Sequence, residues 1–95
     1  MDREEAAAVA EGVIARLRAT SYDSLVARLL GEIEVEEIVG ASGVTYQAEI
    51  QAMWDAGKPP ALLVMVGVDD GGFRSSFSPV SRSFITTGHG TFIGE

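Results

Sequence analysis

The spacing of the apolar residues changes at Gly31, and this change restricts the fold more than any other feature of the sequence. Before Gly31, apolar side chains recur every three or four residues, as they do along one face of an α-helix. After Gly31, they alternate with other residues, as they do in a β-strand. Helices followed by strands with short turns predict an α+β fold, with one or two N-terminal helices packed on one face of a four-stranded antiparallel β-meander.

The segment before Gly31 predicts one or two helices. Residues 4–18 contain no proline and form an apolar stripe, and their acidic and basic ends follow the order that the helix dipole favours. Thr20 and Ser21 can cap a second helix over residues 22–30, and Gly31 suits the left-handed position at its end. The alternative is one bent helix that runs through both segments.

The segment after Gly31 predicts an edge strand with an acidic side. Glutamate and apolar residues alternate over residues 32–36, so we expect the apolar side to be buried and the carboxylates to face water. The alternation slips at Glu36 and Glu37, where a β-bulge would return Ile38 to the buried side. The acidic run from Glu32 would attract a basic partner, but a charged edge that prevents aggregation is the simpler interpretation.

Two further strands are expected in the middle of the chain. A glycine-rich turn over residues 40–43 precedes a regular alternation over residues 44–55, which predicts a strand with one buried and one polar face. A loop with two prolines over residues 57–60 then leads to residues 61–68, which are apolar on both faces. This last segment therefore belongs in the centre of the sheet.

The C-terminal third predicts a fourth strand and allows a final hairpin. Residues 69–72 read Asp-Asp-Gly-Gly, which is typical of a hairpin turn. Residues 73–78 alternate like a strand, which we expect to end at Pro79. The remaining segment allows a short C-terminal hairpin about residues 88–90, with Phe84, Ile85, Phe92 and Ile93 packed down.

Length and composition limit the class of protein. A chain of 95 residues supports a single domain over residues 1–95, and the absence of cysteine excludes disulfides and thiolate metal sites. The longest apolar run, residues 61–66, is too short to cross a membrane, and the acidic start is unlike a signal peptide, so we expect a cytoplasmic protein. A net charge of −7 with dispersed basic residues argues against nucleic acid or a membrane as partner and leaves a basic protein as a candidate.

The sequence predicts no catalytic, metal or cofactor site. His89 is the only histidine, and the glycines on both sides of it favour a loop. Asp69 and Asp70 are adjacent, and neighbouring side chains of an extended segment point apart, which favours a turn over a cation site. Gly57-Lys58 precedes two prolines and a strand, unlike a phosphate-binding loop before a helix.

A sheet face of mixed character is the most informative pattern in the sequence. If the two middle strands pair, aliphatic and amide side chains share one face, which suits neither a core nor an ordinary solvent-exposed surface. We expect this face to contact a second copy of the chain or another molecule. The candidate contact residues are Gln47, Glu49, Gln51, Met53, Leu63 and Met65.

Three functions are compatible with these patterns. The first is a non-enzymatic module that binds a protein partner or forms a homodimer through the mixed face. The second is an acidic inhibitor, of the kind that an immunity protein exemplifies, directed at a basic partner. The third is a small-molecule carrier or small enzyme with a pocket between helices and sheet, lined by Tyr22, Tyr46 and Trp54.

Overall fold

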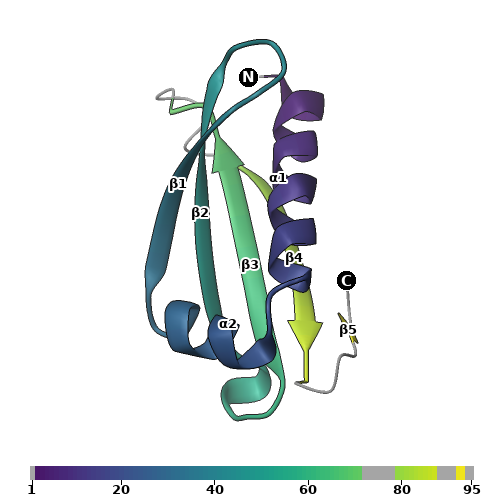
Figure 1. Cartoon of the computed structure of the whole chain (residues 1–95), viewed down its shortest axis with the longest axis vertical. Helices are drawn as coiled ribbons and strands as arrows, with labels where there is room; N and C mark the ends of the chain where they lie inside the picture. Colours follow the sequence, from purple (N-terminus) through teal and green to yellow (C-terminus); the bar gives the residue numbers. More distant parts are fainter. Residues whose placement is uncertain (1, 72–78, 88–91, 94–95) are drawn as a thin grey trace.

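The computed structural model describes residues 2–71, 79–87 and 92–93, and it confirms the α+β fold (Figure 1). Two helices precede an antiparallel meander of four long strands, and a two-residue fifth strand pairs with the fourth. The helices are α1 (Arg3–Arg18) and α2 (Tyr22–Leu29). The strands are β1 (Ile33–Val39), β2 (Thr45–Trp54), β3 (Leu62–Asp69), β4 (Val80–Thr86) and β5 (Phe92–Ile93), and the short 3₁₀ turn η1 (Asp55–Gly57) follows β2.

The two helices are separate because each has its own cap. The Asp2 side chain accepts a hydrogen bond from the backbone N–H of Glu5 at the start of α1. The Ser21 hydroxyl accepts one from the N–H of Ser24 at the start of α2. Gly31 has a φ of 78° just after the second helix, a conformation that favours glycine. The structure therefore confirms two helices and not one bent helix.

Both helices cover the same face of the sheet, and the core lies between these two layers (Figure 1). Helix α1 packs on β3 and β4, while the shorter α2 packs on β2. Alternate residues of each central strand point into the core, as the period of two requires. The largest fully buried side chains are Tyr46, Phe84, Leu17, Leu25, Leu29, Ile50, Leu62, Val64, Val66 and Val68.

Strand β1 turns its glutamate side toward the helices, whereas the sequence predicted that its apolar side would face them. The strand also has no bulge. Its residues pair one to one with β2 from Ile33 to Val39, so the expected bulge at Glu36 and Glu37 is wrong. Without a bulge, Ile38 pairs with buried Tyr46, and this register turns Glu34 and Glu36 toward the helices. Period two was correct, but the side assigned to the core was not.

Two arginines explain why the carboxylates of β1 can face the helices. Arg16 of α1 donates to both carboxylate oxygens of Glu36, at 2.8 and 2.6 Å. Arg28 of α2 donates to Glu34 at 2.8 Å. The ion pair with Arg16 lowers the pKa of Glu36 below its ordinary value. These four side chains are partly exposed, so the pairs fix the position of β1 more than they stabilise the fold.

The strand that pairs with β3 is a segment that the sequence did not predict as a strand of the meander. Val68 pairs with Val80 and Leu62 pairs with Thr86, so the strand that follows β3 in the sheet begins after Pro79. The predicted strand over residues 73–78 lies outside the described residues. The short pairing of β4 with β5 agrees with a C-terminal hairpin, whose predicted turn at residues 88–90 also lies outside them.

Glu5 ties the start of α1 to the turn between β1 and β2. Its carboxylate accepts hydrogen bonds from the backbone N–H and the hydroxyl of Ser42, at 2.8 and 2.6 Å, and from the Tyr46 hydroxyl at 2.7 Å. Because these donors stabilise the ionised form, the pKa of Glu5 lies below its ordinary value. The same contact, together with burial, raises the pKa of Tyr46 to about 12.

This contact predicts a loss of stability in acid. A carboxylate with a lowered folded pKa stabilises the fold fully above its unfolded pKa of 4.5 and loses that contribution as the pH falls through the folded pKa. Conversely, the raised pKa of Tyr46 predicts a loss between pH 10 and about 12. Urea unfolding at a series of pH values should therefore show that the free energy of unfolding falls more steeply in acid for the native chain than for Glu5→Gln. Equal slopes would contradict the role assigned to the Glu5 contact.

Candidate functional site

The six candidate residues lie on the sheet face that the helices leave uncovered, here called the open face. Strands β2 and β3 are antiparallel neighbours joined by a short connection, and their register places Gln51 beside Met65 and Met53 beside Leu63. Glu49 lies beside Gly67, and Gln47 beside Asp69. The structure thus brings Gln47, Glu49, Gln51, Met53, Leu63 and Met65 onto one surface, as the alternation predicts.

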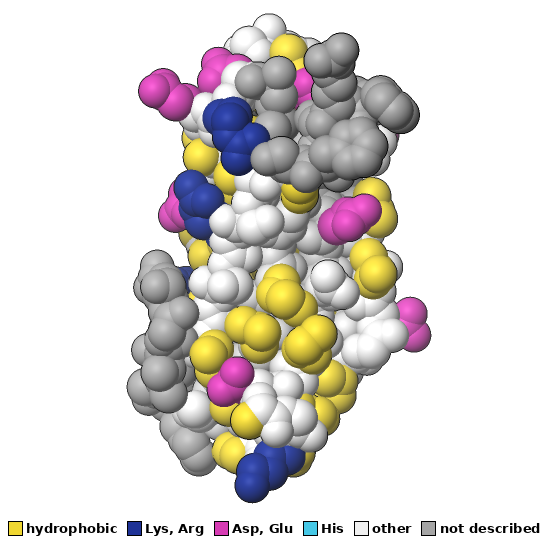
Figure 2. All heavy atoms as spheres, turned by 180° about the vertical axis from the view of Figure 1, so that it is seen from behind, with side chains coloured by type: hydrophobic (Ala, Val, Ile, Leu, Met, Phe, Trp, Pro, Cys, Tyr) yellow, Lys and Arg dark blue, Asp and Glu magenta, His cyan; other side chains and the backbone are white. Residues whose placement is uncertain are grey.

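One half of the open face is apolar. Its side chains, here called the apolar end, come from four strands and lie near the β2–β3 connection (Figure 2). Met53 is 49% exposed and Ile33 is 63% exposed, although both are large hydrophobic residues. This end consists of two lines of residues that pair across the strands, one through Met65 and one through Leu63. Neither line contains a described charged residue. The apolar end consists of Ile33, Met53, Leu63, Met65 and Ile85.

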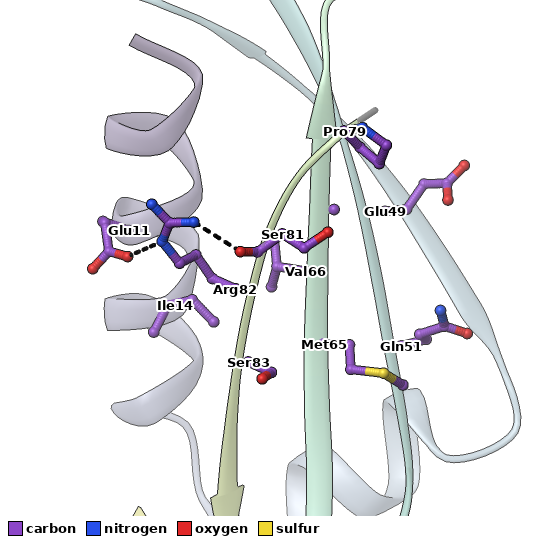
Figure 3. Close-up of a pocket in the computed structure, with 11 residues that line it drawn as sticks. Glu11, Ile14, Glu49, Gln51, Met65, Val66, Pro79, Ser81, Arg82 and Ser83 are labelled. Atoms are coloured by element: carbon purple, nitrogen blue, oxygen red, sulfur yellow. Dashed lines mark hydrogen bonds and ion pairs between the residues drawn. The ribbon is translucent and has the colours of Figure 1, made fainter. Parts of the chain in front are cut away.

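A hollow lies beside the apolar end, where Gly67 has no side chain and its neighbours on β4 are serines. It forms part of an open cavity of about 730 Å³ that extends past β4 to α1 (Figure 3). Figure 3 shows Glu49, Gln51 and Met65 extending on the side away from α1, whereas Glu11 and Ile14 come from that helix. We call the open-face part the Gly67 hollow, and its residues are Glu49, Gln51, Met65, Gly67, Ser81 and Ser83.

The polar side chains of the Gly67 hollow are available to a ligand. Within the described part of the chain, no hydrogen bond or ion pair engages the side chains of Glu49, Gln51, Ser81 or Ser83. Arg82 lines the cavity from the α1 side, and it is already paired with Glu11 at 2.8 Å. The hollow therefore presents one unpaired carboxylate together with amide and hydroxyl groups.

The described strand positions of the open face carry carboxylates and no basic residue, although Arg82, paired with Glu11, lies beside them at the β4 edge. Glu37, Glu49 and Asp69 occupy its polar half, according to the pairing of β1, β2 and β3. The arginines of α1 and α2 that pair with Glu34 and Glu36 lie on the opposite face. Among the residues that the strand pairing places on the open face, every charged one is acidic.

A second open cavity, of about 550 Å³, lies where α2 passes into β1. Its lining includes Gly31, Trp54 and Gly57, and it shares Ile33 and Met53 with the apolar end. The hollowed surface therefore continues from the open face around the edge of the sheet at β1.

The two tyrosines of the small-molecule hypothesis belong to the packing of the core, whereas Trp54 also lines the second cavity. Tyr46 is fully buried, and its hydroxyl donates to Glu5. The Tyr22 hydroxyl donates to the backbone oxygen of Pro60 at 2.8 Å, and Trp54 packs at the edge of the core. Neither tyrosine lines either of the two cavities. The hydroxyls thus hold elements together and do not face a ligand space.

Asp69, which the sequence offered as a candidate for a cation site, belongs to a turn. The Asp69 side chain accepts a hydrogen bond from the N–H of Gly71 at 2.7 Å, as in a turn. Over residues 2–71, 79–87 and 92–93, no group of three or more carboxylate or histidine side chains could hold a metal ion. His89 lies outside the described residues.

Sequence reasoning missed the contributions of β1 and β4 to this surface. Ile33 and Val35 were expected in the core, yet they are 63% and 58% exposed on the open face. Ser81, Ser83 and Ile85 were not assigned to the sheet beside β3. The hydrophobic alternation of β1 was the available signal, and the error lay in assigning its apolar side to the core.

Comparison of the chain with protein-family models, curated proteins and solved structures gave no match. None of the helices in the described part of the chain is long and apolar enough to cross a membrane.

Proposed function

We propose that this protein is a non-enzymatic binding module that uses the open face of its sheet to contact another protein chain. The observation that carries this proposal is the apolar end, where large hydrophobic side chains remain exposed on a face without a helix cover. Contiguous apolar surface of this kind, bordered by polar residues, is typical of protein contact sites. The expected cytoplasmic location remains a prediction.

The size of the face supports a protein as the partner. The molecule measures 37 × 22 × 21 Å, and each partner in a standard interface buries about 800 Å², so a protein partner would cover most of the broad face. The partner is a second copy of the chain or a different protein. An acidic inhibitor of a basic protein is the specific form that the carboxylates of the open face favour.

A charge placed in the apolar end should abolish binding without unfolding the protein. Leu63 is only partly buried and lies at the centre of the apolar end, so Leu63→Asp should prevent a partner from covering it. We expect at least a tenfold loss of the complex, measured by sedimentation velocity for self-association and by quantitative affinity capture for other proteins.

The matched control is Ala8→Asp, which adds the same charge at an exposed position of α1. This variant should bind like the native chain, and circular dichroism should show that both variants are folded. A native chain that is strictly monomeric, with captured proteins that Leu63→Asp also retains, would refute the proposed function.

A further inference from the structure

We infer that the Gly67 hollow receives a basic side chain, arginine or lysine, from a protein partner of different sequence whose apolar residues cover the apolar end. This inference rests on the proposed function and specifies the chemistry of the partner. It combines the open cavity, the unpaired groups around it and the charge of the surrounding face.

The chemistry of the hollow fits a cation with several N–H donors. Glu49 and Gln51 of β2 supply a carboxylate and an amide oxygen on one side of Gly67, and Ser81 and Ser83 of β4 supply hydroxyl oxygens on the other side. A guanidinium group carries five N–H donors in a fixed plane and can use acceptors on more than one side. The methylene stem of such a side chain would lie along Met65, which borders the hollow and belongs to the apolar end.

The space above Gly67 is what lets the side chain enter. A Cβ atom built on Gly67 meets no heavy atom within 4 Å, so the hollow begins directly at the backbone of β3. Bulkier residues in place of Gly67, Ser81 and Ser83 would fill this region. The hollow is therefore a consequence of three small residues on adjacent strands.

Most of the basic residues that the structure describes are poor candidates for the hollow of a second copy. Arg16, Arg28 and Arg82 form ion pairs, and Arg18 lies 5.4 Å above the ring of Phe84. In addition, two chains with a net charge of −7 each repel one another. Lys58, exposed between β2 and β3, is the described basic residue that would serve a homodimer, and it provides a test of that alternative.

The experiment compares two blocked pentapeptides that differ in one charge. The first is acetyl-Leu-Val-Arg-Val-Leu-amide, and the second has citrulline, a neutral analogue of nearly the same shape, in place of arginine. Each is titrated into the ¹⁵N-labelled full chain at low salt, and amide shifts give the dissociation constants. We expect the arginine peptide to bind about tenfold more tightly, to shift the amides of Glu49, Gly67 and Ser81, and to lose most of this advantage in 0.5 M NaCl.

Two carboxylate variants separate the hollow from general electrostatic attraction. Glu49→Gln should reduce the ratio of the two dissociation constants to about one. Glu37→Gln removes the same charge from the same face, outside the cavity lining, and should leave most of the ratio intact. Gly67→Val should fill the hollow without a steric conflict in the fold. It should therefore also reduce the ratio of the two dissociation constants to about one.

The possible failures are distinguishable from failure of the proposed function. The inference that a basic side chain enters the hollow would be overturned by equal affinity for both peptides. It would also be overturned if neither peptide shifted open-face amides at millimolar concentration. In either case, the Leu63→Asp test would still decide whether the protein is a binding module. Equal effects of Glu49→Gln and Glu37→Gln would overturn the assignment to the hollow. A dimer that Lys58→Ala dissociates would replace the heterologous partner with a second copy.

Discussion

Phe84→Ala should destabilise the protein by about 3–5 kcal/mol, which is the typical cost of removing a buried aromatic ring. Phe84 is fully buried on β4, where α1 packs on the sheet, and its ring lies 5.4 Å below the guanidinium of Arg18. Truncation leaves a cavity between helix and sheet and removes this cation–π contact. Because a domain of this size has a total stability of only about 5–10 kcal/mol, urea and thermal unfolding should show a largely destabilised chain.

The adjacent residue supplies the control. Ile85 is on the opposite face of β4, partly exposed and beside Leu63. Ile85→Ala should therefore cost about 1 kcal/mol or less, while it weakens binding at the apolar end. A one-residue shift of β4 would exchange the two faces. A larger loss for Ile85→Ala than for Phe84→Ala would therefore contradict the strand register described above.

Local patterns were sufficient for the helices and for the central strands. The apolar stripe of α1, the cap at Ser21 and the alternation of β2 each act within a few residues, and sequence shows them directly. The open face followed from the same information. Strands β2 and β3 are joined by a short connection, so their pairing could be inferred, and with it the grouping of Gln51, Met53, Leu63 and Met65.

The side of β1 that faces the helices could not be inferred, because it depends on residues that are distant in sequence. Alternation shows that two sides differ, but it does not show which side faces the helices. Glu36 faces them because Arg16, twenty positions earlier, meets it across the edge of the sheet. The usual assumption that apolar residues face the core then placed Ile33 and Val35 on the wrong side.

The strand that pairs with β3 could not be recognised in the sequence for a related reason. Two serines and an arginine stand between Val80 and Phe84, so no regular alternation of apolar residues marks β4 in the sequence. Burial of these two residues depends on packing against α1, which is remote in sequence. The Gly67 hollow needs this pairing of β3 with β4, so it could not be recognised before the structure placed Ser81 beside Gly67.

Gly40→Ala should destabilise the protein by about 1–3 kcal/mol, the usual cost of an added methyl group in a filled space. Gly40 begins the turn between β1 and β2, where its N–H donates to the carbonyl of Val44 at 2.8 Å. A Cβ atom there would lie 2.8 Å from the carboxyl carbon of Glu5 and 2.9 Å from a ring carbon of Tyr46. The ring is buried and the carboxylate is held by Ser42 and Tyr46, so neither group can move away freely.

A glycine-to-alanine substitution in α1 should have the opposite effect on stability. Gly12 is exposed within the helix and its added Cβ meets no atom within 4 Å, so Gly12→Ala should stabilise the protein by up to about 1 kcal/mol. A double-mutant cycle then locates the conflict, because Glu5→Ala should remove part of the cost of Gly40→Ala and none of the gain from Gly12→Ala. If Gly40→Ala were neutral, the carboxylate would have left its hydrogen bonds. The steeper acid loss of the native chain should then disappear in that variant, which the pH series of urea unfolding would reveal.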